Sequence, residues 1–289
     1  MSVSEALGEQ REVQLDLGAV RYRELGTGPP IVFVHGLLVN GDLWRGVVPE
    51  LATAGFRCIT PDWPLGSHSL PMNRDARISP HSIAGLIAGF LDKLDLDGVT
   101  LAGNDTGGAL CQLVVTTRPQ AVARLVLTNC DAFDNFPPKM FLPIKWAAYL
   151  PGALYLLAQS MRLRPMRRLP ISFGWLTRRP IPNDILDSYL NPSARIPGVR
   201  RDATKLLRAI SPRQTLEAAE KLSGFDRPVL LAWAPQDRFF PFAHAERLAG
   251  IFPNARLERV DDCATFVPED QPQHLAGLIA GFMNETGGR

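Results

Sequence analysis

The stretch VTLAGNDTGGALCQLV, residues 99–114, decides the fold. Its first four residues form a short apolar run, which is typical of a strand buried on both faces, and residues 109–114 have the composition of a helix. Between them a single polar residue, Asp105, has Gly103 two positions before it and Gly107 two positions after it. A strand, a tight turn and a helix with small residues around one polar residue is the context of a nucleophile elbow. The sequence therefore predicts that Asp105 stands above a sheet at a helix N-terminus.

The position of Asp105 has chemical consequences. The partial positive charge at a helix N-terminus favours an anion, so we expect an ionised, nucleophilic carboxylate. A carboxylate there would form an alkyl ester with its substrate or abstract a proton, rather than carry out acyl transfer. The alternative interpretation is that Asp105 caps the helix and the glycines serve packing.

Outward from residues 99–114, strands and helices alternate. Two N-terminal stretches, 12–17 and 20–25, have the pattern of a hairpin with Gly18 and Ala19 between its strands. In residues 83–94 the apolar side chains are spaced three and four apart, as in an amphipathic helix. Such alternation predicts a parallel sheet with helices on both faces. The other short strand-like runs are 31–34, 58–60, 125–127 and 229–232.

The alternation stops once, from Asp131 to Pro228, where no convincing strand occurs. A structureless loop of that length would be unusual in a compact domain. We therefore predict a helical cap at 132–227, inserted within one domain whose core is 1–131 and 228–289. Aromatic residues in the cap suggest an apolar substrate: Phe136, Phe141, Trp146, Phe173 and Trp175.

Composition excludes several classes of function. A net charge of +2 over 289 residues gives no reason to expect a nucleic-acid or membrane partner. Four cysteines without paired spacing indicate free thiols and a reducing, cytoplasmic location. Residues 1–10 do not have the pattern of a signal peptide, and the apolar stretch 146–158 is too short to span a membrane. No metal cluster, phosphate loop or dinucleotide fingerprint is present, so we expect no cofactor.

Two further motifs accompany the elbow. VHGLL, residues 34–38, follows one strand-like run, and LAWAPQDRFFP, residues 231–241, contains another run, then Asp237 in a turn. With the elbow, they resemble the α/β-hydrolase superfamily from about Leu15 to Phe282. The resemblance implies an α/β-hydrolase fold, with a mostly parallel eight-stranded sheet, helices on both faces and a helical cap. It also implies an oxyanion hole formed by the amides of Leu37 and Thr106, and Asp237 as the orienting acid. Asp131, after the run 125–127, is an alternative acid.

The superfamily's catalytic histidine has no counterpart here. Where the family has a Gly-His pair, this chain has Ala264 and Thr265. A threonine hydroxyl is no base near neutral pH, and general-base help in releasing an ester is worth roughly 10²–10⁴-fold. His68, in a loop after the run 58–60, is a candidate substitute base, since ligands bind at the carboxyl edge of such sheets.

The aspartate elbow and the cap most resemble the haloalkane dehalogenase and epoxide hydrolase branch. Dehalogenases of this branch place Trp and Asn where this chain has Thr106 and Leu37, so both halide donors are absent. Epoxide hydrolases use cap tyrosines to protonate the ring oxygen, and the cap contains Tyr149, Tyr155 and Tyr189.

Three hypotheses follow for a small, largely apolar molecule. The first is a hydrolase-like enzyme with a remodelled site, in which Asp105 is nucleophile or general base, for example of a lyase, cyclase or isomerase, and Thr265 contacts the ligand. The second is an epoxide or alkyl halide hydrolase with an unconventional base such as His68. The third is a non-catalytic binding protein. The sequence does not indicate the oligomeric state.

Overall fold

The computed structural model describes residues 4–287. Its centre is an eight-stranded sheet in the order β1-β2-β4-β3-β5-β6-β7-β8. The β1-β2 and β2-β4 pairs are antiparallel, and all other pairs are parallel. The predicted α/β-hydrolase fold with a mostly parallel sheet is therefore confirmed. The strands are β1 Glu9–Leu15, β2 Gly18–Leu25, β3 Pro30–Val34, β4 Arg57–Pro61, β5 Thr100–Asp105, β6 Arg124–Cys130, β7 Val229–Trp233 and β8 Ala255–Arg259.

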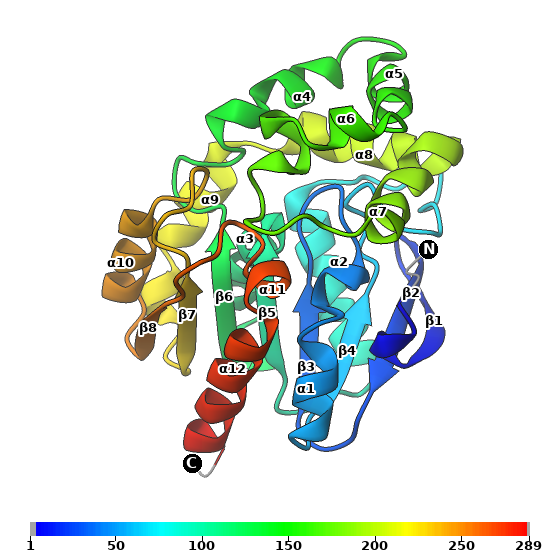
Figure 1. Cartoon of the computed structure of the whole chain (residues 1–289). Coiled ribbons are helices and arrows are strands. Elements are labelled where there is room, and N and C mark those ends of the chain that lie inside the picture. Colours follow the sequence, from blue (N-terminus) through cyan, green and yellow to red (C-terminus); the bar gives the residue numbers. More distant parts are fainter. Residues whose placement is uncertain (1–3, 288–289) are drawn as a thin grey trace.

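Helices cover both faces of the sheet (Figure 1). On one face, α1 (Val48–Thr53) packs against α12 (Pro272–Thr286), and the short α11 (Val267–Asp270) lies just before α12. On the other face, α3 (Thr106–Thr117) contacts both α2 (Pro80–Lys93) and α9 (Pro212–Ala219). Helix α10 (Phe242–Ile251) contacts β7 and β8.

Helix α2 shows how the sequence sets these elements. Ser79 caps its first turn in a reciprocal capping box with Ser82, and Pro80 occupies the first helical position. The apolar residues spaced three and four apart, such as Ile83 and Ile87, are buried. The period of 3.6 residues thus turns one stripe of the helix toward the core.

Between β6 and β7 the chain forms a helical layer above the carboxyl ends of the parallel strands (Figure 1). This layer places apolar side chains over the end of β5, where Asp105 lies. Its elements are η4 Lys139–Phe141, α4 Leu142–Ala147, α5 Ala153–Ser160, α6 Arg164–Arg167, the π-helical turn η5 Pro170–Gly174, α7 Asn183–Arg195 and α8 Pro197–Ala209; the chain then continues through α9 and η6 Leu222–Gly224. Short 3₁₀ segments elsewhere are η1 Glu5–Leu7, η2 Gly41–Trp44 and η3 Pro119–Ala121.

The first turn of the sheet differs from the sequence prediction. The β1-β2 turn lies at Asp16 and Leu17, so the prediction of Gly18 and Ala19 was wrong; both already pair with β1, opposite Leu15 and Gln14. The four cysteines are free and buried. Within residues 4–287, no helix has the length and apolarity needed to cross a membrane.

Candidate active site

Asp105 occupies a strained backbone position between β5 and α3. Its φ of 55° and ψ of −132° are unusual for a residue with a side chain. The bend is tight because the backbone of Gly107 packs against Val34 and His35. A Cβ on Gly107 would collide with the carbonyl oxygen of Val34. Gly36 leaves room for the carboxylate itself, since a Cβ there would collide with Asp105 Oδ2.

The charge state of Asp105 differs from the expectation. The amides of Thr106 and Leu37 stabilise the charged form, and so does the hydroxyl of Thr106. Burial outweighs them and, with the neighbouring Asp237 carboxylate, raises the pKa of Asp105 to about 7. Desolvation in this site therefore exceeds the stabilisation at the helix N-terminus, on which the expectation of an ionised carboxylate rested.

Asp131 lies next to Asp105 rather than in an orienting position. Its Oδ2 accepts a hydrogen bond of 3.1 Å from the hydroxyl of Thr106, whose side chain also stabilises the Asp105 carboxylate. Burial and the charge of Asp105 raise the pKa of Asp131 well above its usual range. Oδ1 of Asp131 is buried and has no hydrogen-bond partner among the described residues. Two carboxyl groups with raised pKa values thus share one hydroxyl neighbour.

Asp237, whose charge acts on Asp105, is hydrogen-bonded to Thr265. The hydroxyl of Thr265 donates to Asp237 Oδ1 over 3.0 Å, at the position where the sequence resemblance led us to expect a histidine. Asn129 donates to Asp237 Oδ2 over 2.8 Å, and the amide of Phe239 donates to Oδ1 over 2.7 Å. Burial raises the pKa of Asp237 to about 6 in spite of these donors. Thr265 is fully buried and does not line the cavity, so the hypothesis that it contacts the ligand is not supported.

Two asparagines position this cluster and were not recognised from the sequence. Asn129 also joins β6 to the end of β7, since its Oδ1 accepts from the amide of Ala234 over 2.7 Å. Asn104, next to the elbow residue, donates to the backbone carbonyl of Thr265 over 2.7 Å. Each asparagine is a polar residue at the carboxyl end of an otherwise apolar strand, and this pattern could have indicated that both belong to the site.

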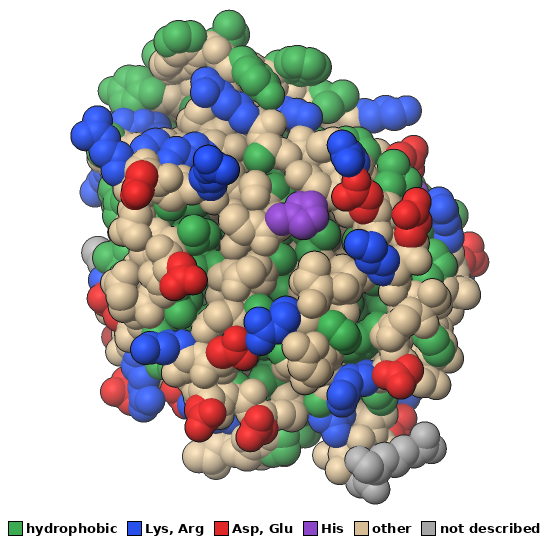
Figure 2. Space-filling view, turned by 180° about the vertical axis from the view of Figure 1, so that it is seen from behind, with side chains coloured by type: hydrophobic (Ala, Val, Ile, Leu, Met, Phe, Trp, Pro, Cys, Tyr) green, Lys and Arg blue, Asp and Glu red, His purple; other side chains and the backbone are tan. Residues whose placement is uncertain are grey.

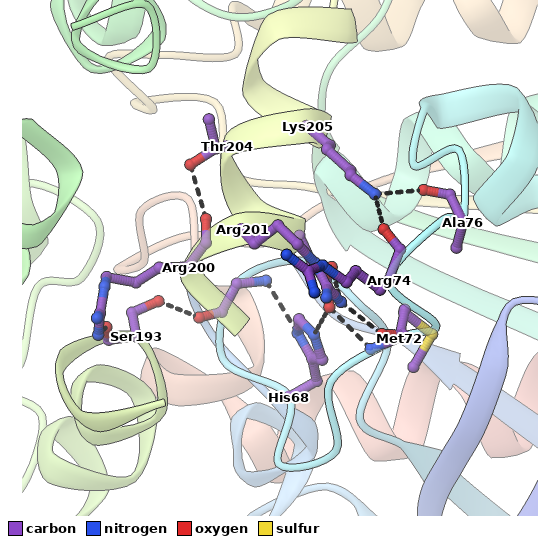
Figure 3. Close-up of polar contacts among 11 residues, drawn as sticks. His68, Met72, Arg74, Ala76, Ser193, Arg200, Arg201, Thr204 and Lys205 are labelled. Atoms are coloured by element: carbon purple, nitrogen blue, oxygen red, sulfur yellow. Dashed lines mark hydrogen bonds and ion pairs between the residues drawn. The ribbon is translucent and has the colours of Figure 1, made fainter. Parts of the chain in front are cut away.

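His68 belongs to a different group of polar contacts, between the loop after β4 and helix α8, which Figure 3 shows. Its Nε2 lies 3.3 Å from Asp202 Oδ2, and the backbone N–H of Gly66 faces its Nδ1 at 3.4 Å. Burial lowers the pKa of His68, although Asp202 opposes the shift. Asp202 Oδ2 also accepts from the amide of Met72 over 2.8 Å. His68 does not line the cavity above Asp105, so its placement does not support a role as substitute base. It ties the loop after β4 to helix α8.

The cavity above the pair has a volume of about 160 Å³ and mostly apolar walls. Space of this size suits a small molecule. Asp105, Thr106 and Asp131 form its polar floor. Its apolar walls include Leu37, Phe141, Ile144, Leu154, Leu157, Phe173 and Leu176.

No tyrosine hydroxyl of the cap is available above Asp105. Tyr189 lines the cavity, but its hydroxyl donates to Glu269 over 3.1 Å. Tyr149 is half exposed and donates to the carbonyl of Arg208. Tyr155 is 47% exposed and does not line the cavity. Within residues 4–287, no group of three or more His, Cys, Asp or Glu side chains could hold a metal ion.

Comparison with known proteins places the chain in a family. A curated relative, haloalkane dehalogenase 2 of Mycobacterium tuberculosis, is 27% identical over 94% of this chain and 93% of its own length. A second relative, 2-hydroxy-6-oxononadienedioate/2-hydroxy-6-oxononatrienedioate hydrolase 2 of Pseudomonas putida, is 26% identical over 94% of each chain. Among solved structures, the haloalkane dehalogenase DatA of Agrobacterium tumefaciens matches with a TM-score of 0.80 and 23% identity, over 98% of this chain and 99% of that one. The epoxide hydrolase CorEH matches with a TM-score of 0.78 and 22% identity, over 96% and 99%. The family model for the alpha/beta hydrolase fold matches residues 29–272, and the chain therefore belongs to this family.

Proposed function

We propose that this protein is a hydrolase-like enzyme that moves a proton on a small, largely apolar molecule, with Asp105 as general base and Asp131 as general acid. The observation that carries the proposal is that both carboxyl groups, each with a raised pKa, face one apolar cavity beside the hydroxyl of Thr106. Acid–base catalysis is most efficient when the pKa of the base lies near the working pH, as it does for Asp105.

The surroundings of the two carboxyl groups support this division of roles. The amides of Thr106 and Leu37 stabilise a negative charge on Asp105. The carboxyl group of Asp131 accepts one hydrogen bond, from Thr106, and its Oδ1 has no partner among residues 4–287. A proton shared by the pair is therefore more stable on Asp131, whose free oxygen can donate it to a substrate oxygen.

Over one turnover, the carboxyl groups of Asp105 and Asp131 together gain and lose the same number of protons. Asp105 takes a proton from a carbon next to a carbonyl, and Asp131 gives its proton to the carbonyl oxygen, which forms an enol. In an isomerisation, Asp105 returns its proton to a different carbon and Asp131 recovers the enol proton. In an elimination, Asp131 gives its proton to a departing hydroxyl group instead of to the carbonyl oxygen. The group leaves as water, the electron pair of the broken C–H bond forms the double bond, and the proton gained by Asp105 returns to Asp131, directly or through solvent.

This chemistry does not require the missing imidazole. No ester with Asp105 is formed, so no water has to be activated to release one. The replacement of the family's histidine by Thr265 then leaves turnover intact, and the hydrogen bond from Thr265 to Asp237 satisfies a buried carboxylate.

A second candidate is hydrolysis of an epoxide or an alkyl halide through an ester on Asp105. The strained elbow and the 27% identity to a haloalkane dehalogenase favour it. It lacks a base to release the ester, and His68 is engaged with Asp202. The third possibility, a binding protein without chemistry, uses the same cavity.

Two measurements separate these candidates. The protein is incubated in deuterated water with a panel of small apolar ketones and enones, and deuterium incorporation is followed by mass spectrometry. Proton transfer predicts incorporation that Asp105→Asn abolishes, with Asp97→Asn, an exposed acid just before β5, as the control. The panel is then extended to epoxides and alkyl halides. Catalytic release of diol or alcohol, with no deuterium incorporation into the ketones, would establish the second candidate and exclude the first.

A further inference from the structure

The outer surface of the cap carries nearly all of the exposed large hydrophobic side chains of the described residues. Eight of the nine lie between residues 140 and 169, and the ninth, Leu216, is on α9. Leu150, Leu156 and Leu163 are 65%, 67% and 63% exposed, and Trp146 is 63% exposed. We define the cap patch as these eight residues: Met140, Trp146, Tyr149, Leu150, Tyr155, Leu156, Leu163 and Leu169.

The helices under the patch are apolar on both sides. Leu154 and Leu157 of α5 line the cavity, whereas Tyr155 and Leu156 of the same helix are exposed. In α4, Ile144 lines the cavity and Trp146 is exposed. A surface helix of a water-soluble domain ordinarily keeps its outer face polar. A helix with two apolar faces indicates that something apolar covers the outer one.

The segment that carries the patch has charge of one sign, and Asp187 of α7, an acidic side chain beside it, is paired with Arg167. Residues 135–183 contain eight Lys and Arg residues and no Asp or Glu. Lys139, Arg162, Arg164 and Arg168 are exposed, and none of them forms a salt bridge among residues 4–287. Figure 2 shows hydrophobic side chains along the top of the molecule, over the cap, with Lys and Arg side chains directly below them. The net charge of +2 conceals this separation, because acidic residues elsewhere in the chain offset the basic cap.

We propose that the cap patch docks on the surface of an anionic lipid membrane. Apolar side chains inserted among the lipids, with basic side chains at the level of the headgroups, is the arrangement of proteins that lie on a bilayer. Trp146, Tyr149 and Tyr155 suit the boundary between apolar and polar layers. Arg208 lies over the ring of Tyr149 and Arg200 over that of Tyr155, which holds basic groups beside both rings.

A second copy of this chain is the less favourable occupant. Two cap patches placed face to face would bring together basic surfaces without acidic partners, and their repulsion opposes association. An anionic membrane supplies both the apolar layer and the opposite charge. The expectation of no membrane partner rested on the net charge of the whole chain and does not take account of this local separation.

Co-sedimentation with vesicles tests the proposal independently of catalysis. The full-length protein is mixed with vesicles of phosphatidylcholine alone or in equal mixture with phosphatidylglycerol. We expect binding to the mixed vesicles, little to the neutral ones, and release at high salt. Trp146 is the most exposed of the tryptophans, so binding should shift tryptophan emission to the blue, and lipids brominated in their acyl chains should quench it.

Matched variants identify the surface. Leu156→Glu and Leu163→Glu should each weaken binding at least about tenfold, as should Arg164→Glu combined with Arg168→Glu. Leu216→Glu and Arg213→Glu, exposed positions on α9, should bind like the wild type. Circular dichroism checks that each variant is folded. No binding to the anionic vesicles at low salt, or equal losses in the cap and α9 variants, would overturn the proposal. A concentration-dependent dimer that Leu156→Glu abolishes, without vesicle binding, would instead assign the patch to a second copy.

Discussion

The hydroxyl of Thr265 lies 3.0 Å from Asp237 Oδ1 and donates a hydrogen bond to it, at the position where the sequence resemblance led us to expect an imidazole. Neighbours hold both residues: Asn104 donates to the backbone carbonyl of Thr265, and Asn129 donates to the carboxylate of Asp237. The carboxylate of Asp237 thus has hydrogen-bond donors at both oxygens, one of them the threonine hydroxyl. Because a threonine hydroxyl cannot activate water as an imidazole does, we expect an ester formed on Asp105 to be hydrolysed slowly.

An epoxide should label Asp105 and remain attached. The elbow presents the carboxylate to the cavity, and no histidine among the described residues lines that cavity to activate water for ester hydrolysis. Intact-mass analysis should show one adduct per chain in the wild type and none in Asp105→Asn. Replacing both residues, Ala264→Gly with Thr265→His, should place an imidazole beside Asp237 and convert the stable adduct into catalytic release of diol. Diol formation by the wild type at the rate of the double variant would contradict this account.

The folded protein should lose stability as pH rises, because of Asp105. Its pKa is raised from 3.8 unfolded to about 7 folded, so between these values the folded state binds more protons. Stability from this group is greatest below the unfolded pKa and falls as pH rises through the folded pKa. Asp105→Asn cannot lose a proton, so its stability relative to the wild type should increase by about 2–3 kcal/mol from about pH 5 to about pH 8. Denaturant unfolding at both pH values measures this difference, with Asp97→Asn as the control. If the difference in the free energy of unfolding between Asp105→Asn and the wild type is the same at both pH values, Asp105 has an ordinary pKa.

Removing the charge of Asp237 should lower the pKa of Asp105, since that charge is one cause of the upward shift. The pH dependence of epoxide labelling reports the fraction of Asp105 that is ionised. Its midpoint, near about pH 7 in the wild type, should move downward in Asp237→Asn. In Asp131→Asn it should stay in place, because a protonated Asp131 carries no charge to remove. A downward shift in Asp131→Asn equal to that in Asp237→Asn would mean that Asp131 is ionised.

His68→Ala should reduce stability without affecting the site. His68 is a partner of the fully buried Asp202, and the exchange removes a hydrogen bond and leaves a cavity. We expect a loss of about 2–4 kcal/mol in the free energy of unfolding, with the rate of epoxide labelling unchanged. Release of diol by the wild type that is lost in a His68→Ala variant of normal stability, while labelling is kept, would restore His68 as a base.

The sequence carried enough information to predict the fold and to locate Asp105, Asp237 and Thr265. These residues follow strands whose apolar runs and small neighbours have few alternative structures. The contact of Asp131 could not be predicted, because β6 ends at Cys130 and side-chain alternation cannot be extended past a strand end. The raised pKa of Asp105 could not be predicted, since the cost of burial depends on the cap that closes above it.

The sequence could not show which side chains of the cap line the cavity. Its helices are apolar on both sides, so periodicity could not separate cavity walls from exposed surface. Phe141 and Phe173 line the cavity as expected for an apolar substrate site. Trp146 instead faces outward, and Phe136 is fully buried in the core.

The most direct test of the central claim is the infrared difference spectrum of the wild type against Asp131→Asn at neutral pH. If Asp131 is the acid of the pair, the wild type should show the C=O stretch of a protonated carboxyl group that is absent from Asp131→Asn and still present in Asp105→Asn. If that band is missing from the wild type, or disappears in Asp105→Asn but persists in Asp131→Asn, then Asp131 is not the proton donor and the proposed division of roles is wrong.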